Sequence, residues 1–513
     1  MSRRASDALA IVAALVVVAA CARGAAILLA YPWDWAPDEG LALDYARRLL
    51  EAPHTLYGRE LIPFPAAYTP LLPLLLAPLV RASEEPLLLA RILALAWTAA
   101  AALALFILVR RRAGPVLGCV AVALAVAPRD FSIWLLLVRV DGLMIALWLG
   151  AAAALMPARL EEGADELSSA RLWTGAALLL ASVLTKPTAV IHGAPLVVGW
   201  FLVNRRSAWR LTAAMFAAGL AALLALQLAT DGGFLWTMRL WAMHPWHPGL
   251  LGRLVSTFVI AHGMLLVLVG VAIVLAWRRR ERPFRDGAWL LVLGGLAILP
   301  SLGKGGAWTN YLLPLYCALV ALACRLWPAM PSMAVLVPAA LGIALLARPF
   351  PLPTSADAAT SAAFYSFVRD RGRPLLATRP DYAYFVVGQP VEAEGSGLPY
   401  LVAAHVPGTE ELLERVRRRH YRLIVALPYF WPNDRAFEAA LSDGYEIAGT
   451  CTLAFFYGRS EFVLLLPRGD AARFVPPPEV RCRSFTDAPV SPAPPPGSPV
   501  GDAPQRRAVP PSG

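Results

Sequence analysis

The sequence is poor in charged residues. Only 16% of its 513 residues are charged, whereas 58% are hydrophobic and the mean hydropathy is +0.58. Soluble domains carry about 25% charged residues, so this composition excludes an ordinary soluble protein and predicts a polytopic α-helical membrane protein. The net charge of +11 does not indicate a nucleic-acid partner, because the arginines stand in short runs between apolar segments, as cytoplasmic anchors do.

The sequence also has no cysteine motif. None of its six cysteines stands in a CxxC or other metal-ligand spacing. Four cysteines lie in apolar segments, and only Cys451 and Cys482 lie in the polar carboxy-terminal part. The sequence leaves open whether these two form a disulfide.

About eleven membrane spans are predicted from apolar runs of suitable length. Arg3 and Arg4 precede the first run, which is too long for a signal peptide and lacks a clear cleavage site, so it is predicted to be an uncleaved anchor. The run Pro70–Val80 is assigned to the outer surface, because counting it as a span would place Arg110–Arg112 outside. The predicted spans are 8–30, 86–109, 113–128, 136–156, 172–185, 188–203, 209–229, 254–277, 287–302, 309–324 and 331–348.

This topology divides the chain into three parts. Residues 1–348 are predicted to form a membrane domain with a cytoplasmic amino terminus, in a bacterial inner (plasma) membrane. Residues 349–475 contain helix and strand patterns that predict an extracytoplasmic α/β domain. Residues 476–513 contain twelve prolines in 38 positions and are predicted to be a disordered tail.

The first outer loop, residues 31–81, carries two adjacent acids, Asp38 and Glu39. Pro37 suits the first position of a helix, and apolar residues recur at helical spacing after it, so interfacial helices are predicted here. Acids close to a membrane span often mark functional sites. The alternative is that both acids only stabilise the first turn through the helix dipole.

Lysine is almost absent. Of 46 basic residues only Lys186 and Lys304 are lysines, and both fall at outer ends of predicted spans. A compact, flexible ammonium suits a phosphate group, whereas the alternative is that both lysines simply snorkel to the membrane surface. Lys186 lies in the break between two short predicted spans. Irregular backbone at membrane depth is tolerated mainly where it lines a cavity.

Further polar residues are predicted on the same outer face. Arg139 and Asp141 begin a span, and Asn310 and Tyr311 follow a glycine-rich loop. Together with the first-loop acids and the lysines, they give the acids and bases that transfer from a phosphate leaving group requires. His244, in an outer loop rich in tryptophan, could bind a metal, but without a third ligand nearby an aromatic interfacial loop is favoured.

Five segments of residues 1–330 resemble the GT-C superfamily of membrane glycosyltransferases, which includes protein O-mannosyltransferases and lipid A aminoarabinose transferases. They are Trp33–Gly40, Tyr68–Pro70, Arg139–Asp141, Leu184–Lys186 and Asn310–Pro314. The resemblance implies inverting transfer of a sugar from a polyprenyl-phosphate donor to a hydroxyl of a lipid, glycan or protein acceptor. Tyr68–Pro70 departs from the aminoarabinose enzymes, which carry a basic residue before paired prolines, so the sugar and the acceptor stay open.

The resemblance also implies roles for single residues. Asp38 would be the general base, and Glu39 would orient the acceptor or, with Asp141, bind a divalent metal. The residues expected to hold the lipid phosphate are Lys186, Lys304 and Arg139. Weaker contacts with the sugar or acceptor are expected from Tyr68, Asn310, Tyr311 and His244.

Two other classes of protein compete with this interpretation. A transporter or lipid flippase would also combine many spans with charges, but the sequence has no convincing internal repeat, and its charges lie at one face rather than at the midplane. A non-catalytic assembly protein would explain the carboxy-terminal domain but not the acids. The sequence therefore favours the transferase.

Overall fold

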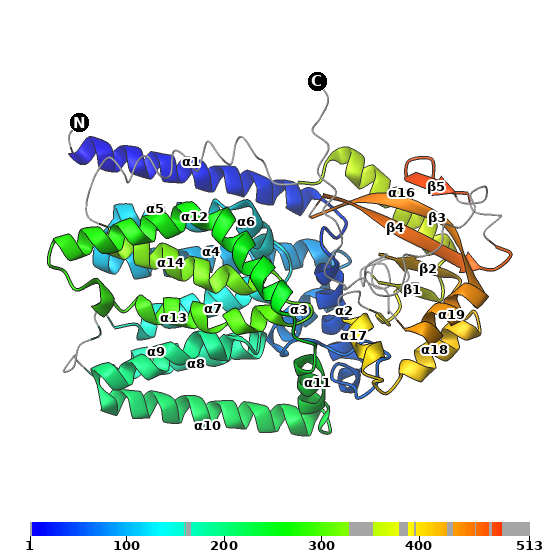
Figure 1. The fold of residues 1–513 in the computed structure, drawn as a ribbon, viewed down its shortest axis with the longest axis horizontal. Coiled ribbons are helices and arrows are strands. Elements are labelled where there is room, and N and C mark those ends of the chain that lie inside the picture. Colours follow the sequence, from blue (N-terminus) through cyan, green and yellow to red (C-terminus); the bar gives the residue numbers. More distant parts are fainter. Residues whose placement is uncertain are drawn as a thin grey trace.

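The structure is a computed structural model of the chain. It describes residues 3–157, 160, 166–327, 352–378, 388–393, 397–427, 434–456, 458–470 and 475–484. A bundle of helices forms one part of the molecule, and a mixed α/β domain lies at one end of it (Figure 1). The predicted span 331–348 lies outside the described residues.

Apolar helices make up the bundle and confirm a helical polytopic membrane protein. Among the described residues, five helical segments are long and apolar enough to cross a membrane: α1 (Arg3–Ala30), α4 (Pro86–Ala113), α10 (Arg205–Ala229), α12 (Pro248–Arg278) and Thr309–Leu326, which contains α14 (Leu313–Leu326). The shorter apolar helices include α5 (Pro115–Val126), α7 (Val140–Leu155), α8 (Ser169–Thr185), α9 (Ala189–Val203) and α13 (Trp289–Ala297). The first ten predicted spans each contain one of these helices, whereas the total of eleven stays a prediction.

A buried ion pair joins the end of α14 to the segment before α13. Arg325, at the end of α14, donates from Nε to Asp286 at 2.8 Å and from Nη1 to the carbonyl of Leu108 at 2.7 Å. Arg112, at the end of α4, lies 3.6 Å from the same aspartate. Arg112 also lies 3.9 Å from Glu281, so the arginine run at the end of α4 lies beside the run at the end of α12.

The first outer loop folds back against the bundle as two helices, α2 (Pro37–Glu51) and α3 (Leu71–Ala82). Helix α2 begins at Pro37, as predicted. Arg48 fixes the return segment by donating to the carbonyl of Phe64 at 2.6 Å. Thr69, just before α3, donates its hydroxyl to the carbonyl of Val183 at 2.8 Å, so the loop is tied to α8 one turn before Lys186.

The α/β domain is built around one five-stranded sheet of order β1-β2-β4-β3-β5, in which only β1 and β2 are parallel. The predicted combination of helices and strands in this part of the chain is confirmed. The strands are β1 (Leu375–Ala377), β2 (Leu423–Ala426), β3 (Tyr445–Phe455), β4 (Gly458–Pro467) and β5 (Arg481–Ser484), and the helices are α16 (Ser355–Arg371), α17 (Leu398–Ala403), α18 (Thr409–Arg417) and α19 (Arg435–Gly444).

The sheet extends past residue 475, the predicted end of this domain. Strand β5 pairs with β3, and a disulfide joins Cys482 of β5 to Cys451 of β3. Proline content alone predicted disorder here, but a short edge strand held by a disulfide needs little apolar sequence of its own. Residues 485–513 lie outside the described residues.

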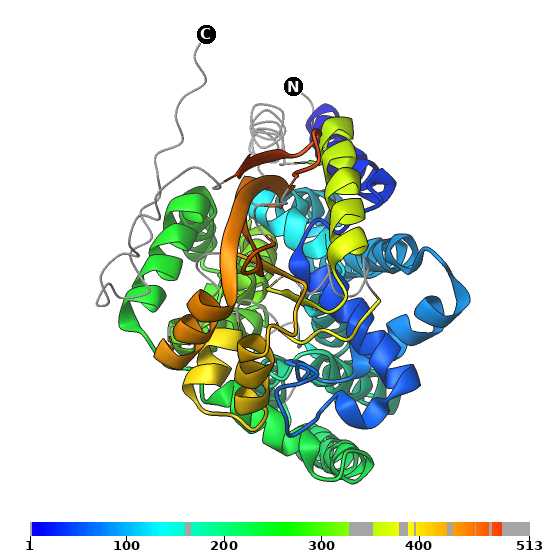
Figure 2. The same cartoon turned by 90° about the vertical axis from the view of Figure 1, so that its right-hand side faces the viewer.

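The domain docks on the segment that links α1 to α2. Tyr365 of α16 stacks on Trp33 with ring centroids 4.5 Å apart and donates its hydroxyl to Asp34. The amide of Phe456 donates to the carbonyl of Trp35 at 3.2 Å. Seen from the end, the domain lies in front of the bundle with α16 passing beside the first outer loop (Figure 2). The domain thus covers the bundle end that carries Asp38 and Glu39.

Candidate active site

Asp141, at the start of α7, is the centre of a buried ionic cluster. Its side chain is fully buried, and Lys186 donates to Oδ1 from 2.7 Å. The Asn310 amide donates to both carboxylate oxygens at 3.1 Å, and Arg139 Nε lies 3.3 Å from Oδ2. Four predicted residues from three separate parts of the sequence therefore meet at one point.

Asp38 joins this cluster through Arg139, whose guanidinium bridges the two aspartates. The Asp38 side chain is 29% exposed, whereas that of Asp141 is fully buried. Asp38 also lines a pocket together with Tyr45, Tyr68 and residues of α2, α3 and the start of α7. Of the two acids, Asp38 is the one that a ligand can reach.

Two aromatic rings hold the cations of the cluster. Trp134 lies under the Arg139 guanidinium at 4.2 Å, and Tyr311 lies under the Lys186 ammonium at 4.3 Å. Cation–π contacts of this length contribute about 0.5–2 kcal/mol and fix the direction of the charge. Tyr311 is therefore at the site as predicted, and Trp134 was not anticipated.

Glu39 does not face the pocket. Its carboxylate receives Arg91 Nε at 2.9 Å and Nη2 at 2.7 Å, together with the Trp35 amide at 2.8 Å. Arg91 also donates to the carbonyls of Leu28 and Tyr31 at 2.9 and 2.6 Å. This pair joins the end of α1, the start of α2 and α4, directly beside Asp38 in the chain.

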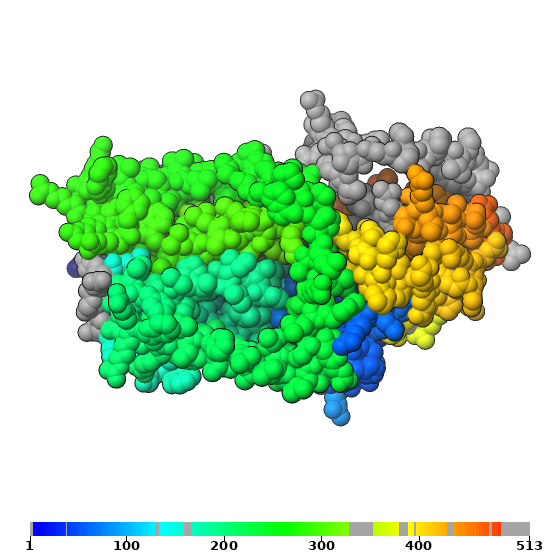
Figure 3. All heavy atoms as spheres, turned by 60° about the horizontal axis from the view of Figure 1, so that its bottom comes forward, coloured from blue at the N-terminus to red at the C-terminus, as the bar shows by residue number. Residues whose placement is uncertain are grey.

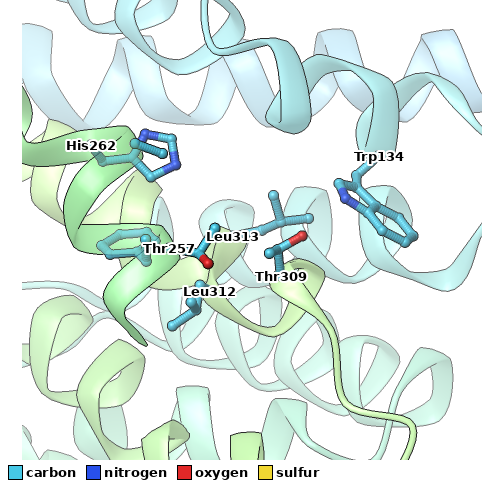
Figure 4. A pocket seen from close by; sticks show the side chains of 8 residues that line it. Trp134, Thr257, His262, Thr309, Leu312 and Leu313 are labelled. Carbon is cyan, nitrogen blue, oxygen red and sulfur yellow. The ribbon is translucent and has the colours of Figure 1, made fainter. Parts of the chain in front are cut away.

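A second pocket lies next to Trp134. Trp134, Thr257, His262 and Thr309 line it with apolar residues (Figure 4). Helix α12 has non-helical backbone angles at His262, where the chain kinks. Trp134, which lines this pocket, packs against Arg139, which lines the pocket of Asp38.

Solved structures of two membrane glycosyltransferases are similar to most of this chain. ArnT from Cupriavidus metallidurans in the apo state matches with a TM-score of 0.54 and 15% identity, over 88% of this chain and 97% of that chain. The same protein bound to undecaprenyl phosphate matches with a TM-score of 0.55 and 13% identity, over 89% and 98%. Archaeal oligosaccharyltransferase AglB from Archaeoglobus fulgidus, in complex with an inhibitory peptide and a dolichol-phosphate, matches with a TM-score of 0.53 and 11% identity, over 88% and 74%.

The chain has the GT-C fold. No protein-family model matches the sequence, and no curated protein matches it. Identities this low establish the fold, and the chemistry has to be argued from the site.

Within the GT-C fold, Lys304 and His244 belong to a different cluster from Asp141. Lys304 donates to the carbonyl of Trp241 at 3.3 Å, and His244 Nδ1 donates to the carbonyl of Gly305 at 2.9 Å. No contact in the described structure joins Lys304 to Asp141 or Asp38. The prediction that both lysines hold one phosphate is therefore not supported by this arrangement.

The arrangement does not favour a metal ion at Glu39 and Asp141. Each carboxylate is already neutralised by a buried cation, Arg91 for Glu39 and Lys186 for Asp141. Among the residues that the structure describes, no group of three or more His, Cys, Asp or Glu side chains is suited to hold a metal. Use of a divalent metal stays a prediction.

Sequence reasoning missed Arg91. It lies inside the second predicted span, and a charge within a span marks a functional or structural site by default. That signal was available. Its partner, Glu39, could not be predicted, because the two residues are 52 positions apart and only tertiary packing brings them together.

Proposed function

We propose that this protein is an integral membrane glycosyltransferase that moves a sugar from a polyprenyl-phosphate donor to an acceptor hydroxyl on the extracytoplasmic face. The observation that carries the proposal is the exposed Asp38 carboxylate beside Arg139 in a pocket at the domain-covered end of the bundle. The GT-C fold supports the class of reaction, and the structures of its relatives with undecaprenyl phosphate and dolichol-phosphate support the class of donor.

Asp38 is proposed as the general base. A base must reach the proton that it removes, and Asp38 is partly exposed whereas Asp141 and Glu39 are enclosed by their partners. In the transfer, the acceptor oxygen forms a bond to the anomeric carbon while its proton passes to Asp38. The bond from that carbon to the phosphate oxygen breaks, and the electron pair leaves with the phosphate.

Arg139 is proposed as the principal phosphate ligand. A guanidinium suits a phosphate because it can donate two parallel hydrogen bonds. A donor phosphate on Arg139 would compete with Asp38 for the same guanidinium and would release the Asp38 carboxylate to accept a proton. Donor binding and activation of the base would then be coupled.

Lys186 and Asn310 support the phosphate site through Asp141. The Lys186 side chain is only 2% exposed and its ammonium is bound to Asp141. Its positive charge would therefore act on the phosphate at a distance, whereas Arg139 would contact the phosphate directly. A fixed positive field near a leaving phosphate stabilises the charge that develops on it. In this role, Lys186 is needed for catalysis although its ammonium does not contact the phosphate.

The test is turnover by the purified full chain in lipid nanodiscs. The protein is incubated with a panel of polyprenyl-phosphate sugars, and free polyprenyl phosphate is quantified with time. A transferase releases polyprenyl phosphate from at least one donor, and a hydroxylated acceptor accelerates this release. A flippase or an assembly protein would leave every donor intact, and that result would reject the proposal.

A further inference from the structure

Three segments that are far apart in the sequence meet where the α/β domain touches the bundle. They are α11 (Gly233–Ala242) with the loop after it, the glycine-rich loop 303–308, and α17. A side chain at Gly305 would collide with the Tyr400 ring, and one at Gly397 would collide with the Trp241 ring. Glycine at these positions lets the three segments approach closely.

Aromatic rings line this junction. Trp241 and His244 have ring centroids 5.1 Å apart, and His244 and Tyr400 have centroids 4.7 Å apart. Adjacent rings of this kind offer broad apolar faces edged by polar groups, which is the usual make-up of a binding site for an organic ligand. The apolar C–H face of a sugar ring fits such a surface.

Two ring nitrogens in this cluster are buried without a hydrogen-bond partner among the described residues. His244 Nδ1 carries the proton that it donates to Gly305, so the neutral ring presents Nε2 as an acceptor. Trp241 Nε1, a donor, is also buried and unpaired. Buried polar groups are almost always paired, so these two atoms indicate that a donor and an acceptor beyond the described residues complete the cluster.

Lys304 adds a positive charge without a carboxylate partner in the described chain. Its ammonium donates to a backbone carbonyl, that of Trp241, at 3.3 Å. Burial lowers the pKa of Lys304, because a desolvated ammonium is costly when no anion offsets it. Lys304 is one of only two lysines in the sequence.

We infer that Trp241, His244, Tyr400 and Lys304 form a second binding site, which takes a sugar that carries a negative charge. The rings pack against the sugar, the ammonium pairs with its carboxylate or phosphate, and the unpaired nitrogens bond its hydroxyl groups. The loop that carries Lys304 continues to Asn310 of the Asp141 cluster. If the proposed function holds, this site binds the acceptor, and the acceptor is an anionic glycan.

The access route agrees with this placement. In the space-filling view, the face beside α11 is hollowed between that green segment and the teal helices around residues 170–200, and blue atoms of the first outer loop are visible inside (Figure 3). Helix α11, one of the three segments of the junction, therefore borders a hollow in the surface. A water-soluble acceptor would arrive from this side.

The two lysines provide a direct test of binding. The intact protein in nanodiscs is treated with an amine-acetylating reagent, and acetylation of Lys304 is followed by peptide mass spectrometry, with the buried Lys186 as internal reference. Glucuronate and glucose 6-phosphate are the probes, and glucose and inorganic phosphate are the controls. We expect either charged sugar to slow acetylation of Lys304 saturably, by about tenfold at ten times its Kd, and both controls to protect far less.

A variant ties the protection to this cluster. His244→Phe keeps an aromatic ring but removes the buried acceptor, so the half-protecting concentration should rise about tenfold. His54→Phe, at an exposed position in the first outer loop, should leave it unchanged, and a thermal melt of each variant confirms folding. Absence of protection by both charged sugars, or equal protection in His244→Phe, overturns the inference.

The outcome is separable from that of the proposed function. Protection of Lys304 does not require turnover, so it persists in Asp38→Asn if the site is real. A protein that binds charged sugars here but consumes no polyprenyl-phosphate donor would reject the transferase and keep the site. A protein that consumes a donor but shows no protection of Lys304 by charged sugars would keep the transferase and reject the second site.

Discussion

Asp38 and Glu39 are consecutive in the chain, but their carboxylates have separate partners. The Asp38 side chain is 29% exposed and faces Arg139, whereas that of Glu39 is fully enclosed by Arg91. The helical geometry of α2 turns neighbouring side chains about 100° apart, so one acid faces the pocket and the other faces the bundle. The acidic pair of the sequence is therefore one partly exposed carboxylate beside one enclosed carboxylate.

The Glu39–Arg91 pair should be essential for stability. Arg91→Met leaves the Glu39 carboxylate buried without its cation, and breaking one partner of such a pair costs about 3–5 kcal/mol. Thermal unfolding in detergent should show a clear fall in Tm. Glu51→Gln, at an acid on the same helix that is 68% exposed, is the matched control and should change Tm little. Equal Tm values for Arg91→Met and the wild type would contradict the structural role.

Lys186 should be required for turnover more than for folding. Asp141 in Lys186→Met keeps Arg139 and Asn310 as partners, so the site retains part of its neutralising charge. Loss of one preorganised charge at a transition state lowers kcat by about 10²–10³-fold. The measurement is steady-state release of polyprenyl phosphate, with Lys186→Arg as the charge-preserving comparison. A variant with unchanged kcat would remove Lys186 from the mechanism.

Protonation of His244 should weaken the junction between domain and bundle in acid. Burial lowers the pKa of His244 from its ordinary value of 6.5, and the neighbouring Lys304 ammonium lowers it further; Trp241 and Tyr400 are the other groups against the ring. Below pH 6.5 the unfolded chain binds this proton more readily than the folded one, so the contribution of His244 to stability is full above pH 6.5 and is lost as pH falls. Tm of the wild type should therefore fall more steeply from pH 7.5 to 5.5 than Tm of His244→Phe. An equal change of Tm with pH in the wild type and in His244→Phe would contradict this prediction.

The disulfide between Cys451 and Cys482 should stabilise the α/β domain and mark its compartment. It closes a loop with a sequence separation of 31, for which chain entropy gives about 3–4 kcal/mol, and disulfides persist in oxidising compartments. In right-side-out vesicles, a membrane-impermeant maleimide should label these two cysteines only after reduction with an impermeant phosphine. Labelling without reductant, or only after the membrane is broken, would contradict the extracytoplasmic placement.

Much of the fold follows from the sequence because membrane helices obey local rules. Apolar length locates the spans, arginine runs orient them, and Pro37 begins α2 as predicted. The site was predictable as a set, since Asp38, Arg139, Asp141, Lys186, Asn310 and Tyr311 do converge. The separate placement of Glu39 and Lys304 was not predictable, because Glu39 pairs with Arg91 of another helix and Lys304 bonds the carbonyl of Trp241. Such contacts depend on tertiary packing between distant segments, which spacing along the chain does not encode.

The most direct test of the mechanism is the effect of Asp38→Asn on a single turnover. Asparagine keeps the shape of the side chain but cannot accept the acceptor proton, so the chemical step should slow by about 10²–10⁴-fold while the dissociation constant of the polyprenyl-phosphate donor stays within a few-fold of the wild type. Glu51→Gln, an exposed acid on the same helix, is the control and should match the wild type in both. Turnover by Asp38→Asn at the wild-type rate would show that Asp38 is not the base.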